Sequence, residues 1–113
     1  MYEMTEALDR QILDKAIELT KKYGWVKEAM ALDAKGKEVD PLSSSACSFC
    51  TIGFLSRASY EVAKVPYVRP GVSQKVYTVL NKMNMPPFMS IYNDDYARSL
   101  NDITKLFEAA RDQ

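Results

Sequence analysis

Residues 44–58, SSACSFCTIGFLSRA, predict the element around which the rest of the chain folds. The serines at its start can cap a helix, and the apolar run that follows predicts a helix from about residue 46 to 62. Because this helix is apolar on nearly all sides over its first two turns, we expect it to lie in the middle of the domain. Gly53 costs such a helix about 1 kcal/mol relative to alanine. We therefore expect another backbone to approach Gly53 closely.

Three further helices are predicted on either side of this central helix. Thr5 can cap an amphipathic helix that ends near Gly24, and Ser73 can cap a helix that carries Val76, Val79 and Leu80 on one face. Ser99, followed by Asp102, resembles a capping box and opens the last helix. Residues 83–97 are expected to form an irregular connection. Asp33-Ala34-Lys35-Gly36 is a turn signal, so residues 27–40 are compatible with a short β-hairpin.

These elements predict a mainly α fold. We expect residues 1–113 to form a single domain, a bundle of about four helices with irregular loops, because a chain of 113 residues suffices for one core.

Composition excludes several classes of function. Fifteen basic residues balance fifteen acidic residues, so no overall charge favours nucleic acid, and nucleic-acid binding is not expected. No stretch reaches the roughly 18 apolar residues of a membrane span, and no signal peptide is recognised, so we expect a cytoplasmic protein without a membrane partner. The chain has no histidine, which removes the commonest general base at neutral pH. We therefore predict no catalytic residues and no cofactor.

The chain's two cysteines, Cys47 and Cys50, allow three interpretations. They can pack as small apolar side chains at the start of the central helix, which is the reading we favour. A helix N-terminus can also lower a thiol pKa, as dithiol redox proteins require. A metal site is the third reading, although zinc needs four ligands and one Cys-x-x-Cys supplies two.

A polar segment before the last helix is the other candidate site. Tyr92, Asn93, Asp94, Tyr96 and Arg98 combine aromatic rings with an arginine, the residue types that are enriched at binding hot spots. Asn and Asp also cap helices and stabilise turns, so the segment can equally be structural. The loop offers too few oxygens for Ca²⁺. We favour five tyrosines of the second half of the chain as an interaction surface: Tyr60, Tyr67, Tyr77, Tyr92 and Tyr96.

The order of these blocks resembles an uncharacterised family of small actinobacterial and bacteriophage proteins, a domain of unknown function. Residues 47–55, CSFCTIGFL, stand where the family has Cys-x-aromatic-Cys-Ala-Leu-Gly-Ala-Leu. Residues 90–94, SIYND, stand for Ser-Ile-x-x-Trp-Asn-Asp, with Tyr92 in place of the tryptophan and a two-residue shortening before it. The resemblance implies a bacterial or phage origin and supplies no activity.

Two functions remain open from the sequence. The first is a noncatalytic protein-interaction factor that binds a host or self protein, for example a phage accessory or anti-defence protein. The second is a dithiol redox or metal-binding protein that uses Cys47 and Cys50.

Overall fold

The computed structural model describes residues 2–113, with side chains from residue 5 onward. In this range the chain is mainly helical, as expected, but it has five α-helices instead of four, one π-helical segment and a small mixed sheet. The elements in chain order are α1 (Tyr2–Lys22), β1 (Gly24–Trp25), β2 (Ala31–Leu32), β3 (Ser48–Phe49), α2 (Thr51–Ala63), α3 (Pro70–Lys82), α4 (Met89–Ile91), η1 (Tyr92–Tyr96) and α5 (Leu100–Arg111).

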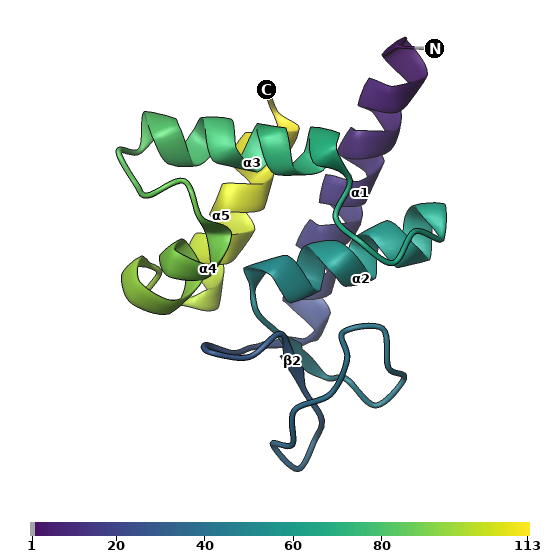
Figure 1. The fold of residues 1–113 in the computed structure, drawn as a ribbon, viewed down its shortest axis with the longest axis vertical. Helices are drawn as coiled ribbons and strands as arrows, with labels where there is room; N and C mark the ends of the chain where they lie inside the picture. The colour runs from purple at the N-terminus through teal and green to yellow at the C-terminus, as the bar shows by residue number, and fades with distance from the viewer. Residues whose placement is uncertain (1) are drawn as a thin grey trace.

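Helix α1 packs against the other long helices (Figure 1). Helix α1 contacts both α2 and α5, and α3 covers α5 and the neighbouring part of α1. Both chain ends lie at the top of the view, and the sheet with its loops lies at the bottom. The Arg10 guanidinium donates to the Gln113 main-chain carbonyl at 3.0 Å, so the end of the chain is held against α1. The sheet and its loops thus lie at the end of the molecule opposite the two chain ends.

A row of aromatic rings runs through the core from the sheet to the last helix. The Tyr23 and Phe49 ring centroids are 5.4 Å apart, those of Phe49 and Phe54 are 5.2 Å apart, and those of Phe54 and Phe107 are 6.3 Å apart. Edge-to-face and tilted arrangements of this kind add to the free energy gained by burying the rings. Phe49, Phe54 and Phe107 are fully buried, so the sheet and the helices share one core.

The prediction that the central helix begins near residue 46 is wrong. Ser48 and Phe49 form strand β3, and α2 begins at Thr51 with Cys50 as its N-cap. A short apolar run fits a buried strand as well as a helix, and periodicity does not separate the two. The two cysteines therefore flank a strand.

Strand β3 lies between the other two strands. It pairs in parallel with β1, with Trp25 opposite Phe49, and antiparallel with β2, with Ala31 opposite Phe49. The hairpin that residues 27–40 allowed is present as a single antiparallel bridge between Leu32 and Glu38. Gly36 takes a φ of 80° at its turn.

A second backbone approaches Gly53, as predicted, although it is not that of a helix. A Cβ atom at Gly53 would collide with the main-chain oxygen of Met30. That same oxygen accepts a hydrogen bond from the Cys50 N–H at 3.1 Å. The start of α2 is thus pressed against the chain that leads into β2, and only glycine leaves room for it.

Several helix ends differ from the sequence prediction. Helix α1 begins at Tyr2, before Thr5, and α3 begins at Pro70, before Ser73. Proline suits the first helical position because its missing N–H is not needed there. Ser99 is the N-cap position of α5, as predicted, but the Asp102 carboxylate makes the observed contact, accepting from the Arg98 N–H at 2.8 Å.

The expectation of an irregular connection over residues 83–97 is wrong from Met89 onward. Helix α4 and the π-helical η1 follow each other directly, and the Ala97 N–H donates to the Tyr92 carbonyl at 2.8 Å, five residues back. None of the helices described in residues 2–113 is long and apolar enough to cross a membrane.

The contact at Gly53 predicts the sign of a substitution. Replacing a glycine inside a helix by alanine ordinarily stabilises it by about 1 kcal/mol. Gly53→Ala should instead lower the free energy of unfolding by about 1–3 kcal/mol, because the new methyl group forces the Met30 carbonyl to move. Urea denaturation followed by circular dichroism measures the change, and a gain in stability would contradict the close approach.

Candidate functional site

Asn93 connects three segments that are distant in the sequence. Its side chain is fully buried, and its Oδ1 accepts hydrogen bonds from the indole N–H of Trp25 at 2.8 Å and from the main-chain N–H and hydroxyl of Thr51 at 2.9 and 2.8 Å. Its Nδ2 donates to the Val26 carbonyl at 3.0 Å and to Asp94 Oδ1 at 2.9 Å. Strand β1, the start of α2 and η1 therefore meet at one amide.

These five contacts fix the orientation of the amide. Three donors surround Oδ1 and two acceptors face Nδ2, so exchanging the two atoms would break every contact except that of the Thr51 hydroxyl, which can also accept. A buried polar group that loses its partners costs about 1–3 kcal/mol. The side chain is therefore a structural requirement of the junction.

The π-helical segment places two consecutive side chains in different roles. Asn93 lies in the interior, whereas Asp94 is half-buried. The Asp94 carboxylate accepts a hydrogen bond from the Glu28 N–H at 3.0 Å. π-helical segments are rare in proteins, and those that occur are often found at functional sites. We therefore examine the surface around η1 first for a functional site.

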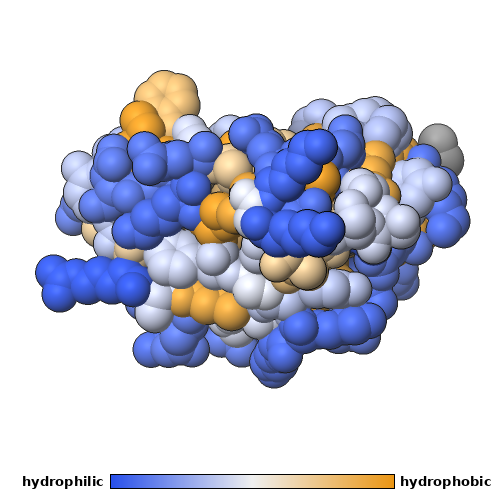
Figure 2. Space-filling view, turned by 90° about the horizontal axis from the view of Figure 1, so that it is seen from below, coloured by the Kyte–Doolittle hydropathy of each residue, from blue (hydrophilic) through white to orange (hydrophobic). Residues whose placement is uncertain are grey.

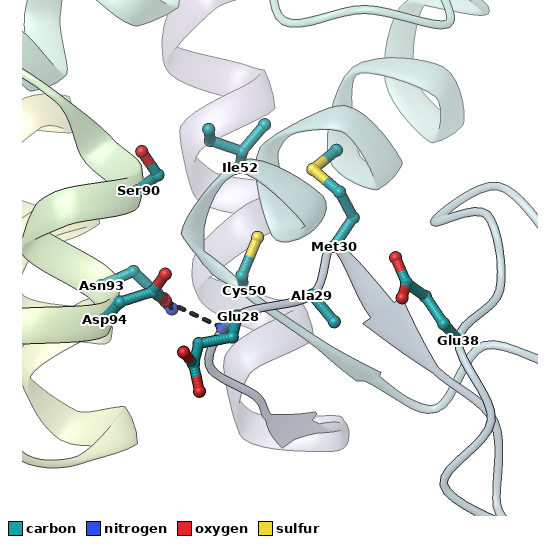
Figure 3. Close-up of a pocket in the computed structure, with 9 residues that line it drawn as sticks. All are labelled: Glu28, Ala29, Met30, Glu38, Cys50, Ile52, Ser90, Asn93 and Asp94. Atoms are coloured by element: carbon teal, nitrogen blue, oxygen red, sulfur yellow. Dashed lines mark hydrogen bonds between the residues drawn. The ribbon is translucent and has the colours of Figure 1, made fainter.

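A pocket of about 340 Å³ lies beside this junction (Figure 3). Ser90, Asn93 and Asp94 form one side of it, and Glu38 stands at the other end. The remaining lining residues come from the chain between β1 and β2 and from the start of α2: Glu28, Ala29, Met30, Cys50 and Ile52. We call this the acidic pocket, because it has three carboxylates and no basic side chain in its lining.

The carboxylates of the acidic pocket differ from several of those on the helices. Glu6 pairs with Lys75 at 2.8 Å, and Asp9 pairs with Arg69 at 2.9 Å. In contrast, no lysine or arginine described in the structure lies within 4.0 Å of the pocket carboxylates. Chemically, the acidic pocket suits a cationic group such as an ammonium or a guanidinium.

The residues predicted for partner binding are divided by the structure. Tyr96 and Arg98 are exposed, with 48% of Tyr96 accessible to solvent. The expectation that Tyr92 presents its ring is wrong, because only 5% of that residue is exposed. Burial, together with the negative charge of Asp102, raises the pKa of the Tyr92 hydroxyl. Asn93 and Asp94 both line the pocket, Asn93 as a buried residue and Asp94 as a half-buried one.

The geometry of the two cysteines weighs against a dithiol pair. Ser48 and Phe49 between them are extended, and a strand rises about 3.3 Å per residue, which puts the two Cα atoms about 10 Å apart. A disulfide requires about 4.4–6.8 Å. Among residues with described side chains, no three His, Cys, Asp or Glu groups are placed to hold a metal ion.

The thiol of Cys50 is also a poor nucleophile. Burial raises its pKa, and the negative charge of Asp94 acts in the same direction. Hydrogen bonds from the N–H groups of Gly53 and Ile52 oppose this effect but are smaller. Burial therefore outweighs the helix N-terminus, which was the basis for expecting a reactive thiol.

Sequence reasoning missed most of the acidic pocket. Glu28, Glu38 and Ser90 carry no motif, and they meet only through the fold. The one available signal was the pair Asn93-Asp94. It indicated the segment, but it did not show that Asn93 is buried while Asp94 is partly exposed.

Asn93→Asp tests the amide junction with almost no change in shape. The new carboxylate has no N–H to donate, so its oxygen would face the Val26 carbonyl and the Asp94 carboxylate without a hydrogen bond. We therefore expect a loss of about 3 kcal/mol in the free energy of unfolding at neutral pH. Asn101→Asp, at an exposed position in the first turn of α5, is the matched control and should be neutral or slightly stabilising. Equal stabilities of the two variants would contradict the role of Asn93.

The thiols provide a separate prediction. In Cys47→Ser, alkylation of the remaining Cys50 should be at least about tenfold slower in the native protein than in urea, because burial limits both access and ionisation. Its raised pKa means that the rate should increase only above the ordinary thiol pKa of about 8.5. Mass spectrometry of mildly oxidised wild-type protein should show no internal disulfide, and rapid formation of one would contradict the extended geometry.

Comparison with known proteins identifies the family of the chain. No curated protein and no solved structure matches the chain. A family model does match over residues 4–113, nearly the whole chain, and this confirms the expectation of a family without an established function. The chain belongs to DUF6197, a family of unknown function.

Proposed function

We propose that the protein is a noncatalytic interaction factor of bacterial or phage origin that binds a host protein in the cytoplasm, as an accessory or anti-defence protein does. Its specific contact is a lysine or arginine side chain of that partner, which enters the acidic pocket. A noncatalytic role is supported by the lack of histidine and by the raised pKa of the Cys50 thiol.

The observation that carries this proposal is the set of carboxylates without basic neighbours. Glu28, Glu38 and Asp94 line one pocket and have no lysine or arginine partner in the described part of the chain, whereas several carboxylates outside it, such as Glu6 and Asp9, pair with one. A partner's cation would form charge-assisted hydrogen bonds there, which are about twice as strong as neutral ones. Because Glu28, Glu38 and Ser90 in its lining are exposed to solvent, such binding should weaken as salt concentration rises.

The size and lining of the acidic pocket favour a side chain over a large cofactor. Its volume of about 340 Å³ is at the lower end of ligand pockets, which span about 300–1,000 Å³. Met30 and Ile52 supply apolar surface, which suits the aliphatic stem of lysine or arginine.

The surrounding surface is consistent with charge as the main source of selectivity. Figure 2 shows the sheet end of the molecule, where hydrophobic residues form small separate patches on a mainly hydrophilic face. Tyr96 and Arg98 are exposed beyond the pocket segment, and we include them in the proposed contact surface because aromatic and arginine side chains are frequent at hot spots.

Capture from bacterial lysate with paired variants tests this function. Immobilised wild-type protein should retain a partner, and the double variant Glu28→Gln with Glu38→Gln should lose it, because two charges are removed without altering size. The double variant Tyr96→Ala with Arg98→Ala should weaken capture, with an unchanged thermal melt.

Asp95→Asn is the matched control. Asp95 is exposed next to Asp94 and does not line the pocket, so this variant removes one charge nearby and should retain the partner. A partner retained equally by wild type and by the Glu28→Gln, Glu38→Gln variant, or one unaffected by 0.5 M salt, would contradict binding through the acidic pocket.

A further inference from the structure

We infer that a cavity between α3, η1 and α5 binds a free aromatic amino acid whose ring carries a polar group, as in tyrosine or tryptophan. The ring of the ligand occupies the cavity and meets the Tyr92 hydroxyl, and its ammonium and carboxylate groups pair with Asp102 and Lys105. This site shares no lining residue with the acidic pocket, and it does not depend on the proposed function.

The cavity measures about 290 Å³ and is lined mainly by apolar side chains. Val79 and Met83 lie at the C-terminal end of α3, and Leu106 and Ala109 come from α5. Val79 and Leu106 are buried, whereas 40% of Met83 is exposed. An apolar ring that covers this methionine removes its surface from water, which is favourable. We call this site the Tyr92 cavity.

The hydroxyl of Tyr92 lacks a hydrogen-bond partner in the described part of the chain. Only 5% of Tyr92 is exposed, and the hydroxyl of a tyrosine buried to this degree usually forms a hydrogen bond. Here the hydroxyl forms none with the residues that the structure describes. A ligand can therefore supply the partner that the chain does not.

This hydroxyl opens into the cavity. Among the described side chains, Ser59 Oγ is the one fully enclosed polar atom without a partner, so the Tyr92 hydroxyl belongs to the small exposed fraction of its residue. The negative charge of Asp102, which lines the same cavity, acts on the hydroxyl. Because burial, together with this charge, raises its pKa, the hydroxyl stays protonated at neutral pH and can both donate and accept.

Asp102 and Lys105 supply opposite charges beside the cavity. They are three positions apart on α5, so they lie on neighbouring parts of one helix face. Lys105 is exposed, and its ammonium lies more than 4.0 Å from every described carboxylate. Asp102 likewise has no basic partner, and only its Oδ2 accepts a hydrogen bond, from the Arg98 N–H. Two opposite charges that do not pair with each other match the ammonium and carboxylate of a zwitterion.

These features together determine the class of ligand. A volume of about 290 Å³ lies just below the range of about 300–1,000 Å³ for ligand pockets, so the cavity suits a single amino acid. An aliphatic side chain would leave the Tyr92 hydroxyl unpaired, and sites with a buried polar group discriminate strongly against such ligands. Tyrosine and tryptophan combine an apolar ring with a hydroxyl or an N–H.

Titration of amino acids into the ¹⁵N-labelled full chain, followed by NMR chemical shifts, tests the ligand class. L-tyrosine or L-tryptophan should bind with a dissociation constant of about 1 mM or lower and should shift the main-chain amide signals of Val79 and Leu106. L-phenylalanine, which lacks the polar group on its ring, should bind at least about tenfold more weakly than L-tyrosine. Failure of both L-tyrosine and L-tryptophan to bind would overturn the inference.

Tyr92→Phe tests the hydroxyl, because it removes that group alone. Since the hydroxyl has no described partner, the thermal melt should not change, whereas the affinity for the bound amino acid should fall about tenfold. Tyr77→Phe is the matched control: Tyr77 is a half-buried tyrosine of α3 that does not line the cavity, so this variant should bind as wild type does. An unchanged affinity of Tyr92→Phe, or a lowered melting temperature, would overturn the role of the hydroxyl.

The charges are tested with a variant and with a neutral ligand. Lys105→Gln, at an exposed position, should weaken binding about tenfold through the lost charge. N-acetyl-L-tyrosine amide and N-acetyl-L-tryptophan amide carry the same rings without either charge and resemble residues within a peptide chain, so each should bind at least about tenfold more weakly than the free amino acid. Equal binding of the neutral and free forms would overturn the assignment of a free amino acid.

Discussion

The side-chain amide of Asn93 is the interaction on which the sheet end of this protein depends. It accepts from Trp25 and Thr51 and donates to the Val26 carbonyl, so β1, the N-terminus of α2 and η1 are held together by one group. Neither a sheet of two-residue strands nor a three-residue helix is stable alone. The amide therefore supplies a link that secondary structure does not, and the acidic pocket exists because these segments are held side by side.

The core determines where that junction can form. Phe49 in β3 contacts the ring of Tyr23, directly after α1, and the ring of Phe54 in α2, which places the sheet against the helices. Gly53 lets the Met30 carbonyl reach the start of α2. Packing thus brings the chain between β1 and β2 to the N-terminus of α2, and Asn93 then closes the arrangement from the other side. The pocket carboxylates follow from this order, because Glu28 sits on the chain so positioned and Asp94 sits next to the amide.

Much of the helical framework could be predicted from the sequence, because long amphipathic segments such as α1 and α5 repeat apolar residues at helical spacing. The beginning of α2 could not, since the apolar run from Ala46 to Leu55 fits both a strand and a helix. The two prolines at residues 86–87 are typical of a loop, and the helical turns that begin soon after them at Met89 were therefore not predicted. The candidate site was predictable only as the polar segment around Asn93. Glu28 depends on a positive φ and on a contact with a residue 66 positions away, and neither leaves a local pattern.

Hydrogen exchange of the Trp25 indole N–H, measured by NMR on the wild-type protein, tests the role of Asn93 most directly. Trp25 is the chain's only tryptophan, so its indole signal is unambiguous. If Asn93 holds the junction together, the Trp25 indole N–H and the Thr51 main-chain N–H share one acceptor and should be protected to the same degree, because they open in the same event. Rapid exchange of the indole N–H beside a protected Thr51 N–H would contradict the account.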